Sequence, residues 1–95
     1  MSADISVTRN DERGRFEAII DGEVVGYSEF TLGEGRIEFT HTVVEDAYEG
    51  EGVGSTLVSQ ALDQVRAEGL EVVATCKFVR SYIERHQEYA DLLAG

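Results

Sequence analysis

The sequence predicts an α+β fold (an α/β arrangement in its second half): a mixed, mainly antiparallel sheet with a β-α-β crossover and a C-terminal helical region. Three observations support this. Apolar and polar residues alternate through the first half. A helical period then follows the glycine-rich stretch at 49–54. An apolar segment comes after that helix, at the spacing that a crossover to a parallel strand needs. The 95 residues suit one small domain, so we treat 1–95 as a single unit.

The first half predicts four strands in an antiparallel meander. The dipeptide Asp21-Gly22 is a strong signal for a two-residue hairpin turn. Asn10 to Gly14 and Gly33 to Gly35 are the other expected turns. Between these turns, strands are expected at 5–9, 15–20, 23–32 and 36–44.

The alternation in 36–44 predicts a two-faced strand, because successive side chains of a strand point to opposite faces. We expect the apolar face to carry Ile37, Phe39, His41 and Val43, and the other face to carry Glu38, Thr40 and Thr42.

The second half predicts a helix, a strand and a second helical region. Gly69 is expected to end the first helix in a left-handed conformation. Residues 70–76 are too apolar for a one-sided strand, so burial on both faces is expected. Residues 79–86 and 88–93 read as helical, with a break near Gln87. The apolar stripe of the first helix comprises Leu57, Val58, Ala61, Leu62 and Val65.

The charge balance limits the classes of partner that the protein is expected to bind. Nineteen acidic residues against eight basic ones give a net charge of −11, and seven of the eight basic residues are arginine. Such a surface repels nucleic acid and anionic lipid, so we expect neither as a partner. Two interpretations of the acidic surface stay open: adaptation to a high-salt cytoplasm, and a solubility-promoting surface on an ordinary acidic protein.

The composition also indicates the cellular compartment in which the protein is expected. There is no run of about 18 apolar residues, which a membrane span would need. The first residues show neither the basic nor the apolar region of a secretory signal. A single cysteine cannot form an internal disulfide. We therefore expect a cytoplasmic protein with no membrane association.

The segment Glu49-Gly-Glu-Gly-Val-Gly54 is the main functional candidate. Glycines let a backbone approach an anion closely, and several amide N–H groups can then point at it. The following helix adds the positive end of its dipole, and Ser55 adds a hydroxyl in the first turn. The segment therefore predicts a phosphate or pyrophosphate cradle that works without basic side chains. A plain flexible turn between strand and helix is the alternative.

Two other phosphate motifs do not fit this segment. A P-loop is excluded because no Gly-Lys-Ser/Thr follows the glycines. A dinucleotide fingerprint is disfavoured because the spacing is Gly-x-Gly-x-Gly and an antiparallel meander precedes it.

The segment Glu49–Gly54 resembles motif A of the GNAT acetyltransferase superfamily, Arg/Gln-x-x-Gly-x-Gly/Ala. Residues 36–92 are similar to a compact GNAT-like family of roughly 90–100 residues. Besides the glycine loop, the matching segments are His41-Thr-Val-Val44, Cys76-Lys-Phe-Val79 and His86-Gln-Glu-Tyr89.

The resemblance implies that the chain binds acetyl-CoA as a cosubstrate. The loop and helix N-terminus would hold the pyrophosphate, and the acyl arm would pair with strand backbone in a split between the fourth and fifth strands. Glu49 stands where the family usually has Arg or Gln, and Glu51 puts another acid in the loop. The implied cofactor-binding residues are Thr42, Val43 and Val44 on the strand, and Glu49, Gly50, Glu51, Gly52, Val53, Gly54 and Ser55 in the loop and helix start.

Cys76 is the first candidate catalytic residue. We expect it at the carboxyl end of a central strand, where open sheets place ligands. The resemblance places it near the acyl thioester, as a nucleophile that becomes acetylated or as a residue that shapes the pocket. A thiol attacks as its thiolate, which a cation such as Lys77 or a helix N-terminus favours. A buried structural cysteine is the alternative.

His41 is the second candidate catalytic residue. The resemblance places it beside the acyl site, and histidine changes charge near neutral pH, which suits deprotonation of an amine. Its expected position on an apolar face fits a core histidine equally well.

Three functions follow from the sequence: an N-acetyltransferase that acts on an amine, a non-catalytic acyl-CoA-binding or sensing module, and an interaction domain without cofactor. No metal site is expected, because two histidines 45 residues apart and one cysteine form no ligand cluster. His86 and Tyr89 are interpreted mainly as residues that pack the C-terminal end.

Overall fold

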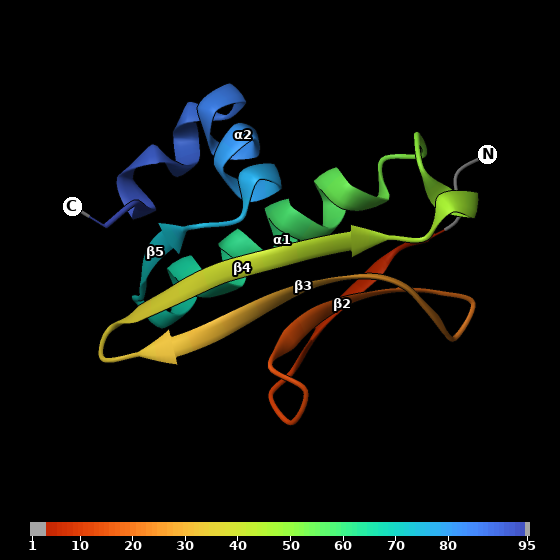
Figure 1. Cartoon of the computed structure of the whole chain (residues 1–95), viewed down its shortest axis with the longest axis horizontal. Helices are drawn as coiled ribbons and strands as arrows, with labels where there is room; N and C mark the ends of the chain where they lie inside the picture. Colours follow the sequence, from red (N-terminus) through yellow and green to blue (C-terminus); the bar gives the residue numbers. More distant parts are fainter. Residues whose placement is uncertain (1–3, 95) are drawn as a thin grey trace.

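The computed structural model describes residues 4–94, and its strands form one sheet in the order β1-β2-β3-β4-β5. The first four strands pair antiparallel and β5 pairs parallel to β4. The α+β fold and the crossover are therefore confirmed, with α1 connecting β4 to β5 (Figure 1). The strands are β1 Ser6–Asn10, β2 Arg15–Ile20, β3 Glu23–Gly33, β4 Arg36–Val44 and β5 Glu71–Ala74.

The hairpin between β2 and β3 forms where the sequence predicts it. Asp21 and Gly22 have φ angles of 51° and 81°. Two successive positive φ angles are the geometry of a type I′ turn, which matches the twist of the flanking strands. The turn therefore sets the pairing of Ile20 with Glu23 and of Ile19 with Val24, beyond which a bulge shifts the β2–β3 register.

The helices are α1 Val53–Glu68 and α2 Lys77–Arg85, with 3₁₀ turns η1 Asp46–Tyr48 and η2 Gln87–Leu92. All five residues of the predicted stripe are buried, and Gly69 ends α1 with φ 72°. The predicted break lies at His86, which adopts non-helical angles between α2 and η2. The turn η1 was not predicted. No helix within residues 4–94 is long and apolar enough to cross a bilayer.

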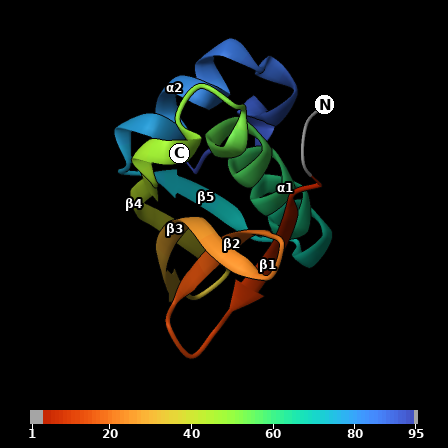
Figure 2. The same cartoon turned by 90° about the vertical axis from the view of Figure 1, so that its right-hand side faces the viewer.

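The core lies between the sheet and the two helices, which pack on the same face of the sheet (Figures 1 and 2). Phe16 anchors it on the sheet side, with its ring centroid 5.3 Å from that of Phe30 and 6.0 Å from that of Phe39. Within residues 4–94 no helix lies on the other face of the sheet (Figure 2). We call it the open face.

A bulge in β4 overturns the prediction of its two faces. Glu29 pairs with His41, but the next residue, Phe30, pairs with Phe39, so Thr40 is an extra residue in β4. A bulge of one residue exchanges the faces of every later side chain. The expected apolar face is therefore wrong beyond Phe39, and His41 is exposed on the open face.

The predicted burial of 70–76 on both faces is also wrong. In this segment Val72 and Cys76 are buried, whereas Val73 is only half-buried and Glu71 is exposed. The reason is that β5 is the last strand of the sheet, and the open face beneath it carries no helix. The C-terminal segment protects its outer edge, since the Ala94 amide donates to the Val72 carbonyl over 2.8 Å.

Candidate functional site

The sheet splits between β4 and β5. Strand β5 pairs with β4 only along Arg36 to Phe39, and the Cys76 amide then bonds to the Phe39 carbonyl. Beyond that point the chain turns into α2, so within residues 4–94 no strand pairs with this edge of β4 as far as Val44.

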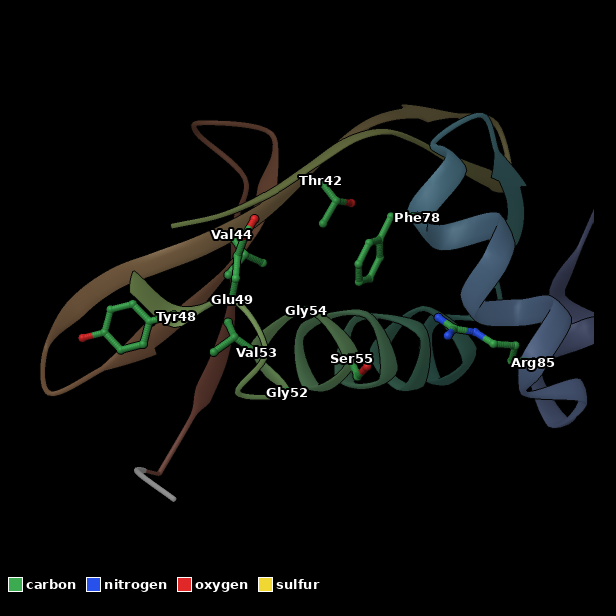
Figure 3. A pocket seen from close by; sticks show the side chains of 11 residues that line it. Thr42, Val44, Tyr48, Glu49, Gly52, Val53, Gly54, Ser55, Phe78 and Arg85 are labelled. Carbon is green, nitrogen blue, oxygen red and sulfur yellow. The ribbon is translucent and has the colours of Figure 1, made fainter. Parts of the chain in front are cut away.

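A pocket of about 410 Å³ lies at this split, between β4, the start of α1 and α2 (Figure 3). Its volume is in the range of small-molecule sites. Its lining includes eight of the twelve residues proposed from the sequence or its resemblance. The lining residues are Thr42, Val44, Tyr48, Glu49, Gly50, Gly52, Val53, Gly54, Ser55, Phe78 and Arg85.

The glycine loop offers a set of free backbone amides to this pocket. Gly50 and Gly52 have φ angles of 81° and 79°, which a side chain would disfavour. The first helical hydrogen bond of α1 is from the Thr56 amide to the Gly52 carbonyl. Within residues 4–94, the amides of Gly50, Gly52 and the segment 53–55 donate no hydrogen bond. Free amides beside the positive end of a helix dipole are an arrangement that suits an anion.

Gly54 has a different role from the other two glycines. Its φ is not in the left-handed region, but a Cβ on it would lie 2.6 Å from Cζ of Phe78. The glycine therefore lets the Phe78 ring lie against the start of α1, inside the pocket (Figure 3).

Two charged side chains line the pocket, one of each sign. Glu49 comes from the loop, and Arg85 comes from the last turn of α2. Glu51 is exposed and is not among the lining residues. The loop thus presents one of its two acids to the pocket.

Cys76 lies behind the pocket wall rather than in its lining. Its side chain is 7% exposed, and its Sγ lies 3.3 Å from the Thr42 hydroxyl, which does line the pocket. The Thr42 hydroxyl is also 2.9 Å from the hydroxyl of Ser28, a fully buried residue. Cys76 precedes the first residue of α2, so its thiol is close to a helix N-terminus. A chain of polar groups thus runs from the core through Thr42 to the thiol.

His41 and Val43 lie away from this pocket. Each pairs across the sheet with an open-face residue, Glu29 and Tyr27 respectively. Val43 lines a separate hollow of about 190 Å³ that also includes Tyr27. The bulge at Thr40 therefore separates both residues from the pocket-lining side chains of Thr42 and Val44.

The aromatic residues near the C-terminus pack the end of the chain, as the sequence suggests. Tyr82 and Tyr89 are both buried, and the ring centroids of Tyr82 and His86 are 4.1 Å apart. The Tyr89 hydroxyl donates to Asp63 on α1 over 2.8 Å. Burial, assisted by this hydrogen bond, raises the pKa of Tyr89 to about 12. Neither tyrosine lines the pocket.

Three lining residues were missed from the sequence: Tyr48, Phe78 and Arg85. Phe78 lies inside the Cys76–Val79 segment, so its spacing from the cysteine could have indicated it. Tyr48 belongs to the unpredicted η1 turn. Arg85 carries no local signal, because only the packing of α2 beside α1 brings it to the pocket (Figure 3).

Comparison with known protein families shows to which family the chain belongs. The family described as GCN5-related N-acetyl-transferase matches residues 15–92, which include the loop, the split and both helices. The chain belongs to this family. We refer to it below as a GNAT protein.

The chain is also similar to individual proteins. The chain is 31% identical to the mouse protein NATD1 over 85 residues, which is 86% of this chain and 76% of that protein. It is 28% identical to NATD1 of Xenopus tropicalis over 88 residues, 90% of this chain and 80% of the relative. The solution structure of a GCN5-like protein from Staphylococcus aureus has the same fold, with a TM-score of 0.72 at 22% identity over 95% of this chain and 88% of that one.

Proposed function

We propose that this GNAT protein is an N-acetyltransferase that transfers the acetyl group of acetyl-CoA to an amine. One observation carries the proposal: the free amides of the glycine loop and the unpaired edge of β4 border the same pocket. A ligand that has a phosphate end and an amide-containing arm can use both features at once. Coenzyme A is such a ligand, and family membership supports its use here.

The residues present fit the pyrophosphate without a basic side chain in the loop. The amides of Gly50, Gly52 and 53–55 would donate to its oxygens, with the Ser55 hydroxyl as a further donor. The pantetheine arm would pair with the free edge of β4 at Thr42 to Val44 and end near Cys76. In this proposal Val43 contributes backbone only, since its side chain faces the open side.

Two routes are open to the acetyl group: direct attack by the amine in a ternary complex, or transfer through Cys76. Within residues 4–94 no histidine lines the pocket, so neither route has a histidine base there. The second route is supported by the place of Cys76 at the start of α2, with its Sγ 3.3 Å from the hydroxyl of the lining residue Thr42. The Cys76 thiolate would attack the thioester carbonyl, and the bond from that carbon to the CoA sulfur would break. The departing CoA thiolate takes up the proton released by the Cys76 thiol. The neutral amine then attacks the carbonyl carbon of acetyl-Cys76 and the bond from that carbon to the Cys76 sulfur breaks. The amide forms, and the proton lost by the nitrogen passes to the released Cys76 sulfur, which restores the thiol.

Intact mass analysis tests the covalent route. Wild type incubated with acetyl-CoA is expected to gain one acetyl group, whereas Cys76→Ser is expected to gain none under the same conditions. A wild type that turns over amine without ever carrying an acetyl group would show direct transfer instead. The His41→Gln variant is expected to keep its activity. A loss of activity in this variant, with an intact fold, would show that His41 takes part in the reaction.

The second candidate function is a non-catalytic acyl-CoA-binding or sensing module. It is favoured by Glu49 in the pocket lining and by the burial of Cys76 behind Thr42. Thiol release from acetyl-CoA in the presence of a panel of amines separates the two functions, because a sensing module binds the ligand without releasing CoA. A chain that binds no CoA at all would be an interaction domain.

The net charge of −11 suggests the class of acceptor. An acidic surface attracts cations over distances of about 8–10 Å at ordinary ionic strength, so we propose polyamines or lysine-containing peptides before neutral amines. A cytoplasmic location belongs to the same proposal, since the free thiol of Cys76 must stay reduced to act.

A further inference from the structure

The pocket carries a cation that the loop itself lacks. Position 49 holds an acid, and the protein as a whole carries a charge of −11, so a phosphate ligand is repelled both locally and at a distance. We propose that Arg85 is a phosphate-binding residue of this pocket and supplies from α2 the positive charge that position 49 does not. The inference rests on the proposed function, because it assigns Arg85 to the same CoA site.

Position supports this role. Arg85 lines the pocket together with Gly52, Gly54 and Ser55, whose amides donate no hydrogen bond within residues 4–94. Its side chain extends from α2 toward α1, on the other side of Phe78 from the end where Tyr48 lies (Figure 3). Among the residues that the structure describes, Arg85 is the only basic one that lines this pocket.

The side chain is also free to bind. Arg9, Arg15 and Arg66 are engaged in ion pairs with carboxylates. Arg80 donates to the Ala74 carbonyl. Within residues 4–94 the Arg85 guanidinium has no carboxylate or carbonyl partner, although nineteen acidic residues compete for eight basic ones. A planar guanidinium matches phosphate oxygens with two parallel hydrogen bonds.

An arginine in the last turn of a helix also has an ordinary structural role, because it complements the negative end of the helix dipole. That role predicts a small loss of stability on substitution and no specific loss of ligand affinity. Affinity and stability must therefore be measured on the same variants.

The experiment compares Arg85→Gln with Arg13→Gln by calorimetric titration of the full chain with CoA and with dephospho-CoA. Arg13 is exposed, lies between β1 and β2, and does not line the pocket, so it controls for the loss of one positive charge. Arg85→Gln is expected to weaken CoA binding by at least about tenfold, the effect of one charged hydrogen-bonding group. Arg13→Gln is expected to stay within about twofold of wild type. Both variants should melt within about 3 °C of wild type, since each loses one exposed charge.

Dephospho-CoA lacks the 3′-phosphate and keeps the pyrophosphate. An equal loss for both ligands places Arg85 on the pyrophosphate, and a loss confined to CoA places it on the 3′-phosphate; either result supports the inference. Equal affinities of Arg85→Gln and Arg13→Gln for CoA would overturn it. Failure of wild type to bind either ligand would instead overturn the proposed function, so the two failures are distinguishable.

Discussion

The ring of Phe78 lies against Gly54 so closely that a Cβ at position 54 would be 2.6 Å from its Cζ atom. Phe78 is 39% exposed, so its ring can move, and both residues line the pocket. The contact links the start of α1 to the start of α2 at the site where the acyl arm would pass.

Gly54→Ala is therefore expected to weaken CoA binding more than it changes stability. The added methyl forces the Phe78 ring to move within the pocket, while alanine in a helix gains up to about 1 kcal/mol over glycine. Calorimetry and urea unfolding measure the two effects. Gly33→Ala, whose Cβ would meet only Arg36 Cγ at 3.4 Å, is the matched control.

A double variant tests the cause. In the background of Phe78→Ala, the substitution Gly54→Ala should leave CoA affinity unchanged, because the clashing ring is gone. An equal loss of affinity in both backgrounds would contradict the steric explanation.

Thr42→Val is expected to destabilise the protein by about 1–3 kcal/mol, because it leaves the buried Ser28 hydroxyl without a partner. Thr42→Ser keeps the hydroxyl and should cost less. Adding Ser28→Ala to Thr42→Val should recover part of the loss, since the unpaired hydroxyl is then removed. Urea unfolding measures all three, and a Thr42→Val variant as stable as wild type would show that the polar chain to Cys76 contributes little.

The two loop acids should differ in their effect on ligand binding. Glu49→Gln is expected to tighten CoA binding, because Glu49 lines the pocket and its charge opposes phosphate. Glu51→Gln removes the same charge outside the lining and should tighten it less. Replacing Glu49 by Arg should extend the gain, most visibly at low salt. Calorimetric titration with CoA at two salt concentrations measures the affinity of all three variants. If Glu49→Gln and Glu51→Gln changed the affinity equally, only the net charge of the protein would matter.

Stability should fall at high pH through Tyr89. Its pKa is raised to about 12 in the folded protein, mainly by burial and then by the hydrogen bond to Asp63. A raised folded-state pKa gives stability that is fully present below the unfolded value of about 10 and is lost as pH rises through about 12. Tyr89→Phe should flatten the fall in unfolding free energy between pH 10 and 12. An unchanged pH profile in that variant would contradict the role of Tyr89.

Most of the fold follows from local signals in the sequence. The Asp21-Gly22 turn sets one hairpin, and the stripe from Leu57 to Val65 sets α1. The bulge at Thr40 could not be predicted, because nothing in the alternation of 36–44 marks an extra residue. That one residue moved His41 to the open face and brought Thr42 to the pocket.

The part of the candidate site that comes from one continuous segment could be predicted from the sequence. The loop at 49–54 was found because glycine spacing before a helix has a physical meaning on its own. Arg85 was not, since it is thirty residues from Ser55 in sequence and lines the same pocket only through packing of α2. Side chains contributed by a distant element carry no local pattern.

A titration with CoA followed by NMR of the backbone amides tests the central claim most directly. We expect saturable shifts at Gly50, Gly52 and 53–55, where the free amides lie, and at Thr42 to Val44 on the unpaired edge of β4. Residues of the open face, such as Glu29, should change little. The absence of shifts in the loop, or shifts confined to the open face, would contradict the account.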